Sequence, residues 1–113
     1  MADTIERFQM VLTTAGSDAQ AESIARALVE RRVAACVNIV HGVCSVFRWK
    51  GEVTREEEKL LLIKTSNTML DRVGETIREL HSYETPELIA LPVEDGDPDY
   101  LEWLSESLKA TPH

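Results

Sequence analysis

Among the two cysteines and three histidines of this sequence, Cys36 and His81 are the candidate ligands of a soft transition-metal ion. A thiolate and an imidazole are the ligands that copper and zinc select in proteins. His81 opens the segment HSYETPE, so that Tyr83, Glu84 and Glu87 follow it closely along the chain. The alternative for Cys36 is a small buried apolar side chain. Metal binding by Cys36 or His81 is therefore one hypothesis that the local sequence supports, and a buried apolar role for Cys36 is the alternative.

Three aspartates near the C-terminus have the spacing of a calcium-binding loop. Asp95, Asp97 and Asp99 match its first, third and fifth positions, and Glu106 falls at the twelfth. The sixth position is Tyr100, however, where the turn of such a loop requires glycine. The residues from Pro98 onward also have helical periodicity, so we expect Asp97 to cap a helix instead.

The two tryptophans, Trp49 and Trp103, are large side chains that are costly to leave in water. Such residues are enriched at protein interfaces. We favour interface packing for both, with the wall of a ligand pocket as the alternative.

Sequence patterns typical of enzymes are missing. The chain has no Gly-x-Ser-x-Gly element, and its five glycines are scattered, so that no phosphate loop or dinucleotide fingerprint is present. The net charge of −8 argues against a nucleic-acid partner and is compatible with the attraction of cations. We therefore expect a protein that is not an enzyme and does not bind nucleic acid.

The size and composition of the chain predict one cytoplasmic domain spanning residues 1–113. No apolar run reaches the 18 or so residues that a membrane span needs, and the N-terminus does not resemble a secretory signal. Cys36 and Cys44 are eight positions apart, about 26 Å on one strand, so they cannot form a disulfide with each other. Unpaired cysteines are typical of a reducing compartment.

The order of predicted elements is β-α-β-β-α-β followed by a helix. Ser17 and Gln20 have the spacing of a capping box at the start of the first helix. The predicted elements are a strand over 6–14, a helix over 18–32, two strands within 34–65, a helix capped by Ser66 or Asn67, a short buried strand over 88–93, and a helix that begins at Asp97-Pro98. This order predicts an α+β fold of the split βαβ type, in which two helices cover one face of a four-stranded antiparallel sheet.

The segment 34–65 is predicted to form one long hairpin that turns at Lys50-Gly51, because tight hairpin turns favour glycine. Val37, Ile39, Val43, Phe47 and Trp49 are expected on one face of its first arm. Residues 54–64 also have high helix propensity, but the adjacent turn favours a strand. Each extended arm would reach about 45 Å, whereas a domain of this size has a radius of gyration of about 13 Å. We therefore expect a partner chain to cover the far half of the hairpin.

Several separated blocks of the sequence together resemble the divalent-cation tolerance (CutA) family. The blocks are AACVNI at 34–39, Trp49 with Gly51-Glu52, Glu57-Glu58 through Lys64-Thr65, Tyr83 with Thr85-Pro86-Glu87, and Asp97 to Leu104. The resemblance implies a ferredoxin-like fold and a homotrimer similar to PII signalling proteins. It also implies a cytoplasmic role in tolerance to divalent metal ions, most often copper, without an established catalytic reaction.

The same resemblance implies where ligands would bind. Cys36 matches the cysteine of the family's AAC motif, whereas Thr13, Leu80 and His81 occupy the positions of a further cysteine and two histidines, so that one imidazole remains. The leading hypothesis is a metal site at Cys36 and His81, in a cleft between subunits that is also lined by Trp49, Glu58, Lys64, Tyr83 and Glu87. One alternative is a PII-like signalling module in which Lys64 pairs with an anionic metabolite or nucleotide. Another is a structural trimer that binds neither.

Overall fold

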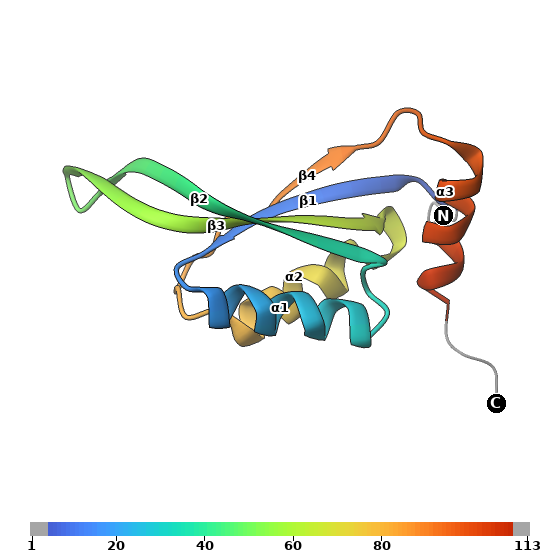
Figure 1. Cartoon of the computed structure of the whole chain (residues 1–113), viewed down its shortest axis with the longest axis horizontal. Helices are drawn as coiled ribbons and strands as arrows, with labels where there is room; N and C mark the ends of the chain where they lie inside the picture. Colours follow the sequence, from blue (N-terminus) through green and yellow to red (C-terminus); the bar gives the residue numbers. More distant parts are fainter. Residues whose placement is uncertain (1–4, 110–113) are drawn as a thin grey trace.

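A computed structural model describes residues 5–109 of the chain, and its elements follow the predicted order (Figure 1). The elements are β1 (Phe8–Ala15), α1 (Asp18–Glu30), β2 (Cys36–Trp49), β3 (Glu52–Ser66), the 3₁₀ helix η1 (Asn67–Met69), α2 (Leu70–Leu80), β4 (Ile89–Pro92) and α3 (Pro98–Ser107). The strands form one antiparallel sheet in the order β2-β3-β1-β4. The predicted α+β, split βαβ fold is confirmed.

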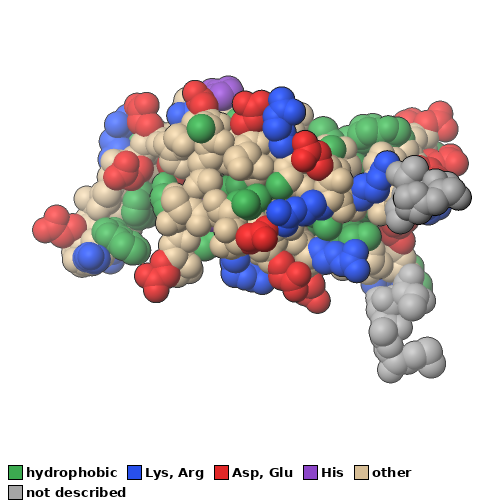
Figure 2. Space-filling model, turned by 90° about the horizontal axis from the view of Figure 1, so that it is seen from below, with side chains coloured by type: hydrophobic (Ala, Val, Ile, Leu, Met, Phe, Trp, Pro, Cys, Tyr) green, Lys and Arg blue, Asp and Glu red, His purple; other side chains and the backbone are tan. Residues whose placement is uncertain are grey.

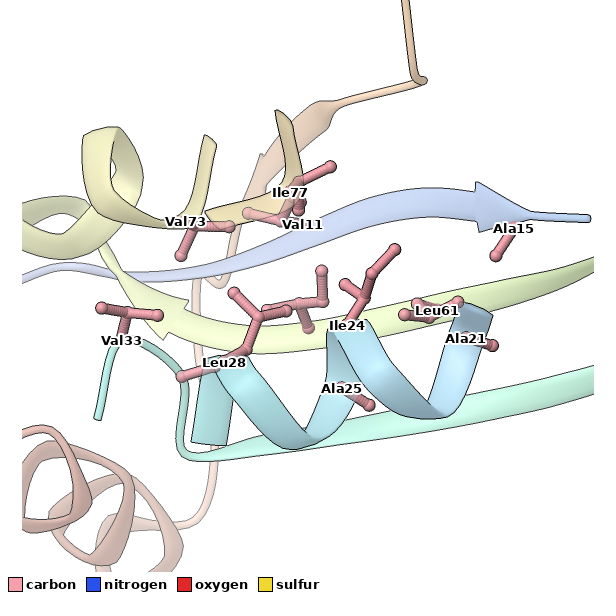
Figure 3. Packing of buried hydrophobic residues seen from close by; sticks show 12 residues of the cluster. Val11, Ala15, Ala21, Ile24, Ala25, Leu28, Val33, Leu61, Val73 and Ile77 are labelled. Carbon is pink, nitrogen blue, oxygen red and sulfur yellow. The ribbon is translucent and has the colours of Figure 1, made fainter. Parts of the chain in front are cut away.

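The hydrophobic core lies between one face of this sheet and the helices α1 and α2 (Figures 1 and 3). The fully buried side chains of Val11 on β1 and Leu61 on β3 point toward the helices, where they pack in one cluster with Ile24 and Leu28 of α1. Ile63 on β3 belongs to the same buried cluster. Ser17 caps α1 as predicted, because its hydroxyl accepts a hydrogen bond from the backbone N–H of Gln20 at 3.2 Å. Among residues 5–109, neither α1 nor α2 lies over the opposite face of the sheet and α3 stands at its end, so we call this opposite face helix-free.

The predicted cap of the second helix is wrong. Ser66 precedes η1, but its hydroxyl lies 2.7 Å from the hydroxyl of Thr68 and makes no cap bond. The side chain of Asn67 instead accepts from the backbone N–H of Arg7 at 2.7 Å and donates to the carbonyl of Ile5 at 3.0 Å. Both polar side chains are used to join the end of β3 to neighbouring residues, so α2 begins without a side-chain cap.

The long hairpin forms as predicted. β2 and β3 pair from Cys36 opposite Lys64 out to Trp49 opposite Glu52. The turn residues Lys50 and Gly51 both have positive φ angles, 51° and 81°, which suits the tight turns that join antiparallel strands. Residues 54–64 lie in β3, so the strand prediction is confirmed over the helical alternative.

A β-bulge in β2 overturns the predicted faces of the hairpin. Val40 pairs with Leu60, whereas Val43 pairs with Glu58, so His41 and Gly42 together face one residue of β3. The extra residue reverses the alternation of side chains, and Gly42 accommodates it with a φ of 74°. Val37 and Ile39 pack on the core, but Val43, Phe47 and Trp49 share the helix-free face with Glu58, by their register.

The short strand near residue 90 is in place, but the prediction that it is buried is wrong. All four residues of β4 are exposed, including Ile89 and Leu91 at 48% and 41%. β4 is an edge strand, and its register with β1 puts Ile89 and Leu91 on the helix-free face. The described chain leaves both of these side chains partly exposed to solvent.

The last helix, α3, lies at the end of the molecule opposite the hairpin tip (Figure 1). Its cap is Asp97, whose carboxylate accepts from the backbone N–H of Tyr100 at 3.0 Å, as predicted in place of a calcium loop. Leu104 and Leu108 pack against Ala35. The projecting hairpin makes the chain elongated, with extents of 48 × 29 × 29 Å and a radius of gyration of 15.1 Å, above the value of about 13 Å for a compact domain of this length.

Candidate functional site

An open cleft of about 920 Å³ lies between the hairpin and the segment that follows α2. Its charged lining is entirely acidic: the carboxylates come from β3 and from the segment 84–87, and within residues 5–109 no Lys, Arg or His lines it. The acidic lining residues are Glu56, Glu57, Glu58, Glu84 and Glu87, and the aromatic ones are Phe47, Trp49 and Tyr83. A cleft of this composition attracts cations and repels anions.

Four of the seven residues that were predicted to line a ligand cleft do so in this structure. Trp49, Glu58, Tyr83 and Glu87 all line the cleft. The register explains two of them, because the bulge at His41 and Gly42 turns Trp49 to the same face as Glu58. Cys36, Lys64 and His81 are not among its lining residues.

A hydrogen bond between Tyr83 and Glu58 closes one wall of the cleft. The Tyr83 hydroxyl donates to Oε2 of Glu58 at 3.0 Å. Glu58 is only 6% exposed and makes no ion pair among the described residues. Partial burial, together with this bond and the negative charges of Glu58 and Glu56, raises the pKa of Tyr83. The cleft thus contains a nearly buried carboxylate without a cationic partner in the described chain.

The glycine between β1 and α1 makes room for Tyr83. A Cβ atom at Gly16 would lie 3.0 Å from the Tyr83 hydroxyl oxygen, which is too close for an ordinary contact. A side chain at this position would require the Tyr83 ring to shift by a few tenths of an ångström. Neither Gly16 nor its role could be recognised in the sequence, because the approach joins residues far apart along the chain.

His81 fastens the segment after α2 to the sheet. Its Nε2 lies 2.6 Å from the Thr14 carbonyl and its Nδ1 accepts from the backbone N–H of Tyr83 at 3.1 Å, which fixes the neutral tautomer with the proton on Nε2. The imidazole is 9% exposed and lies 4.6 Å from the Tyr83 ring, centroid to centroid. Both ring nitrogens are therefore engaged within the chain.

Gln20 also holds the segment that follows α2, and the sequence analysis did not identify it as a site residue. Its side-chain amide donates to the carbonyl of Leu80 at 2.9 Å and accepts from the backbone N–H of Ser82 at 2.8 Å. The sequence assigned Gln20 only to the start of α1. No local signal indicates that its side chain reaches residues 60 positions away.

Cys36 and Lys64 lie apart from the cleft of their own chain. They face each other across β2 and β3, and the Lys64 ammonium donates to the side-chain carbonyl of Asn38. Lys64 is six residues from Glu58 along β3, which corresponds to about 20 Å. In the part of the chain that the structure describes, no three His, Cys, Asp or Glu side chains form a metal-binding group.

The chain is similar to known proteins over most of its length. Residues 9–107 match the family model described as CutA1 divalent ion tolerance protein. The divalent-cation tolerance protein CutA of Thermus thermophilus is 48% identical over 99 residues, which cover 88% of this chain and 96% of that protein. Its solved structure has a TM-score of 0.87, with 88% of this chain and 97% of the other covered.

More distant relatives differ in length and in stated location. Protein CutA of Mus musculus is 43% identical over 93 residues, which cover 82% of this chain but only 52% of the mouse protein. A CutA structure from Archaeoglobus fulgidus, described as a periplasmic divalent cation tolerance protein, has 34% identity and a TM-score of 0.88, and covers 90% of this chain and 99% of that one. None of the helices in residues 5–109 is long and apolar enough to span a membrane.

Proposed function

This chain belongs to the CutA1 divalent ion tolerance family, and we propose that it is a non-enzymatic protein that binds divalent cations in clefts between the subunits of a homotrimer. The observation that carries the proposal is the acidic cleft, in which the nearly buried Glu58 has no cationic partner among the described residues. An ionised carboxylate with so little access to water is stabilised by a bound cation.

The exposed apolar surface of the single chain supports the proposed assembly. Large apolar side chains are exposed along the hairpin and on the helix-free face of the sheet, namely Val40, Val46, Phe47, Trp49, Val53, Ile89 and Leu91. Trp49 and Val53 near the hairpin tip are 59% and 69% exposed. Apolar surface of this extent is typical of a protein interface. In the proposed trimer, sister chains cover the hairpin and the open face.

Copper is the cation for which the candidate ligands are best suited, because they pair a thiol with an imidazole. Cys36 is too far from the cleft of its own chain to act there, so we assign it to the cleft of an adjacent subunit. His81 would bind through Nδ1 after that atom releases the backbone N–H of Tyr83. Glu58 and Glu87 supply oxygen ligands. The proposed metal site is further lined by Trp49, Tyr83 and Lys64.

The cytoplasmic location is part of the same proposal. It rests on the two free cysteines, Cys36 and Cys44, although the Archaeoglobus relative is described as periplasmic. The net charge of −8 supports the absence of a nucleic-acid partner. The PII-like alternative finds little support in this cleft, because an anionic metabolite would face its carboxylates while Lys64 is engaged with Asn38.

Titration calorimetry with Cu²⁺ and Zn²⁺ tests the proposed site. We expect saturable binding that weakens in Cys36→Ala, His81→Ala and Glu58→Gln. Cys44→Ala and His41→Ala are the matched controls, because both residues are exposed on the hairpin outside the cleft. Equal heats in the wild type and all three site variants would remove these residues from the metal site.

A further inference from the structure

A second cavity, of about 460 Å³, lies at the α3 end of the molecule, away from the hairpin. Three regions contribute to its wall. They are the residues directly after α1, Arg31 and Arg32, the start of the η1–α2 helix with Arg72, and the segment directly after α3 with Lys109. Figure 2 views the molecule from the helical side, where Lys and Arg side chains lie between acidic ones. The volume of this cavity is in the range of small-molecule binding sites.

The charge of this cavity is opposite to that of the cleft. Four of the twelve Lys and Arg residues of the chain line it, whereas Glu6 is its only acidic lining residue within the described chain. The chain as a whole carries a net charge of −8. Such a concentration of positive charge on an acidic protein favours an anionic ligand.

Two of the guanidinium groups keep donors available. Arg31 is paired with Glu79 at 2.6 Å and Lys109 with Glu106 at 2.9 Å, so their charges are partly compensated. Arg32 uses Nη1 for a 3.3 Å bond to the carbonyl of Ser107. Among residues 5–109, no ion pair or hydrogen bond engages the guanidinium of Arg72. The remaining donors of Arg32 and Arg72, which line the same cavity, are therefore available to an oxyanion.

The backbone at Arg32 is unusual for an arginine. Its φ is 58°, in the left-handed region that favours glycine. The bonds from the Arg32 N–H to the Val29 carbonyl and from the Val33 N–H to the Leu28 carbonyl, both 3.1 Å, are those of a Schellman motif, in which this position is most often glycine. Strained non-glycine residues cluster at functional sites. The fold thus holds Arg32 in a backbone conformation that costs free energy, with its side chain on the cavity wall.

We propose that this cavity binds the phosphate group of a small anion, with Arg32 and Arg72 as its principal ligands. Planar guanidinium groups match phosphate oxygens through paired hydrogen bonds, which makes arginine the preferred residue for such recognition. Thr68 and Met69, in the first turn of the η1–α2 helix, also line the cavity, so the positive end of the helix dipole adds to the attraction. The site is independent of cation binding in the cleft.

The test is a titration of the full chain, without divalent cations, with inorganic phosphate, pyrophosphate, ADP and succinate. Amide chemical shifts locate the binding and calorimetry measures its affinity. We expect pyrophosphate and ADP to shift the amides of Thr68, Met69 and Arg72, and to bind at least about tenfold more weakly to Arg72→Gln and Arg32→Gly. The glycine variant removes the guanidinium while relieving the backbone, so its thermal stability should not fall.

Arg26→Gln is the matched control, because Arg26 pairs with Glu22 on α1 and does not line the cavity. Its affinity for pyrophosphate should remain within about twofold of the wild type, as expected of an exposed charge outside the site. Equal affinity for pyrophosphate and ADP would assign recognition to the phosphates alone, and tighter binding of ADP would extend the site to the nucleoside. The proposal fails if none of the phosphate compounds binds, if succinate binds as tightly as pyrophosphate, or if Arg26→Gln weakens binding as much as Arg72→Gln.

Discussion

The Tyr83 hydroxyl donates a 3.0 Å hydrogen bond to Oε2 of Glu58, and this bond joins the segment after α2 to the middle of β3. His81 joins the same segment to β1 through a contact with the Thr14 carbonyl. The wall of the acidic cleft is therefore held by two polar contacts between segments far apart in sequence. Each contact can be tested separately.

The first prediction concerns the ionisation of Tyr83. Burial and the neighbouring carboxylates raise the pKa of Tyr83 above the usual tyrosine value of about 10. The only other tyrosine is Tyr100, so in a Tyr100→Phe background the tyrosinate absorbance reports Tyr83 alone. Glu58→Gln should lower the pKa of Tyr83 but leave it above the usual value, because the burial remains. An unchanged pKa in Glu58→Gln would contradict the assigned cause.

The same shift predicts how stability depends on pH. The folded chain holds the Tyr83 proton more tightly than the unfolded chain does, and this difference contributes to the free energy of unfolding. The contribution is fully present below about pH 10, the pKa of an unfolded tyrosine. It should be lost as the pH rises through the folded pKa. Tyr83→Phe should flatten that part of the stability profile, as measured by urea unfolding at several pH values.

The second prediction compares two buried threonines on adjacent strands. Thr13 and Thr65 are both fully buried, but the Thr65 hydroxyl donates to the Val33 carbonyl at 2.6 Å, whereas the Thr13 hydroxyl finds no partner in the described chain. Thr13→Val should raise the free energy of unfolding by about 1 kcal/mol, and Thr65→Val should lower it by about 1–3 kcal/mol. Urea unfolding at one fixed protein concentration measures both. A change of the same sign in the two variants would contradict this assignment.

The third prediction concerns His81 as a structural residue. His81→Ala removes the bonds to the Thr14 carbonyl and the Tyr83 N–H, and we expect it to lower the free energy of unfolding by about 1–3 kcal/mol. His41→Ala, at an exposed position in the bulge, should change it by less than about 0.5 kcal/mol. Equal stability of the two variants would show that the His81 contacts contribute little.

The sequence predicted the order of the elements because their signals are local: Ser17 and Asp97 cap helices, and Lys50-Gly51 turns the hairpin. It did not predict the faces of the hairpin, because a single extra residue at His41 and Gly42 reverses the alternation beyond it. Only the glycine hints at that bulge.

The candidate site was predicted in part. Four cleft residues were found through the family resemblance, but their contacts, such as Tyr83 with Glu58, span 25 positions and have no local signal. The cationic cavity was missed for the same reason. Arg32, Arg72 and Lys109 belong to separate elements, and an overall charge of −8 obscures a local concentration of positive charge.

The most direct test of the proposed assembly is the molar mass of the chain in solution. Light scattering on a size-exclusion column at micromolar concentration should give three times the chain mass of 12.7 kDa, because in the proposed trimer sister chains cover the hairpin and the open face of the sheet. A particle of 12.7 kDa at that concentration would leave Trp49, Val53 and Ile89 in water and would contradict a cleft built between subunits.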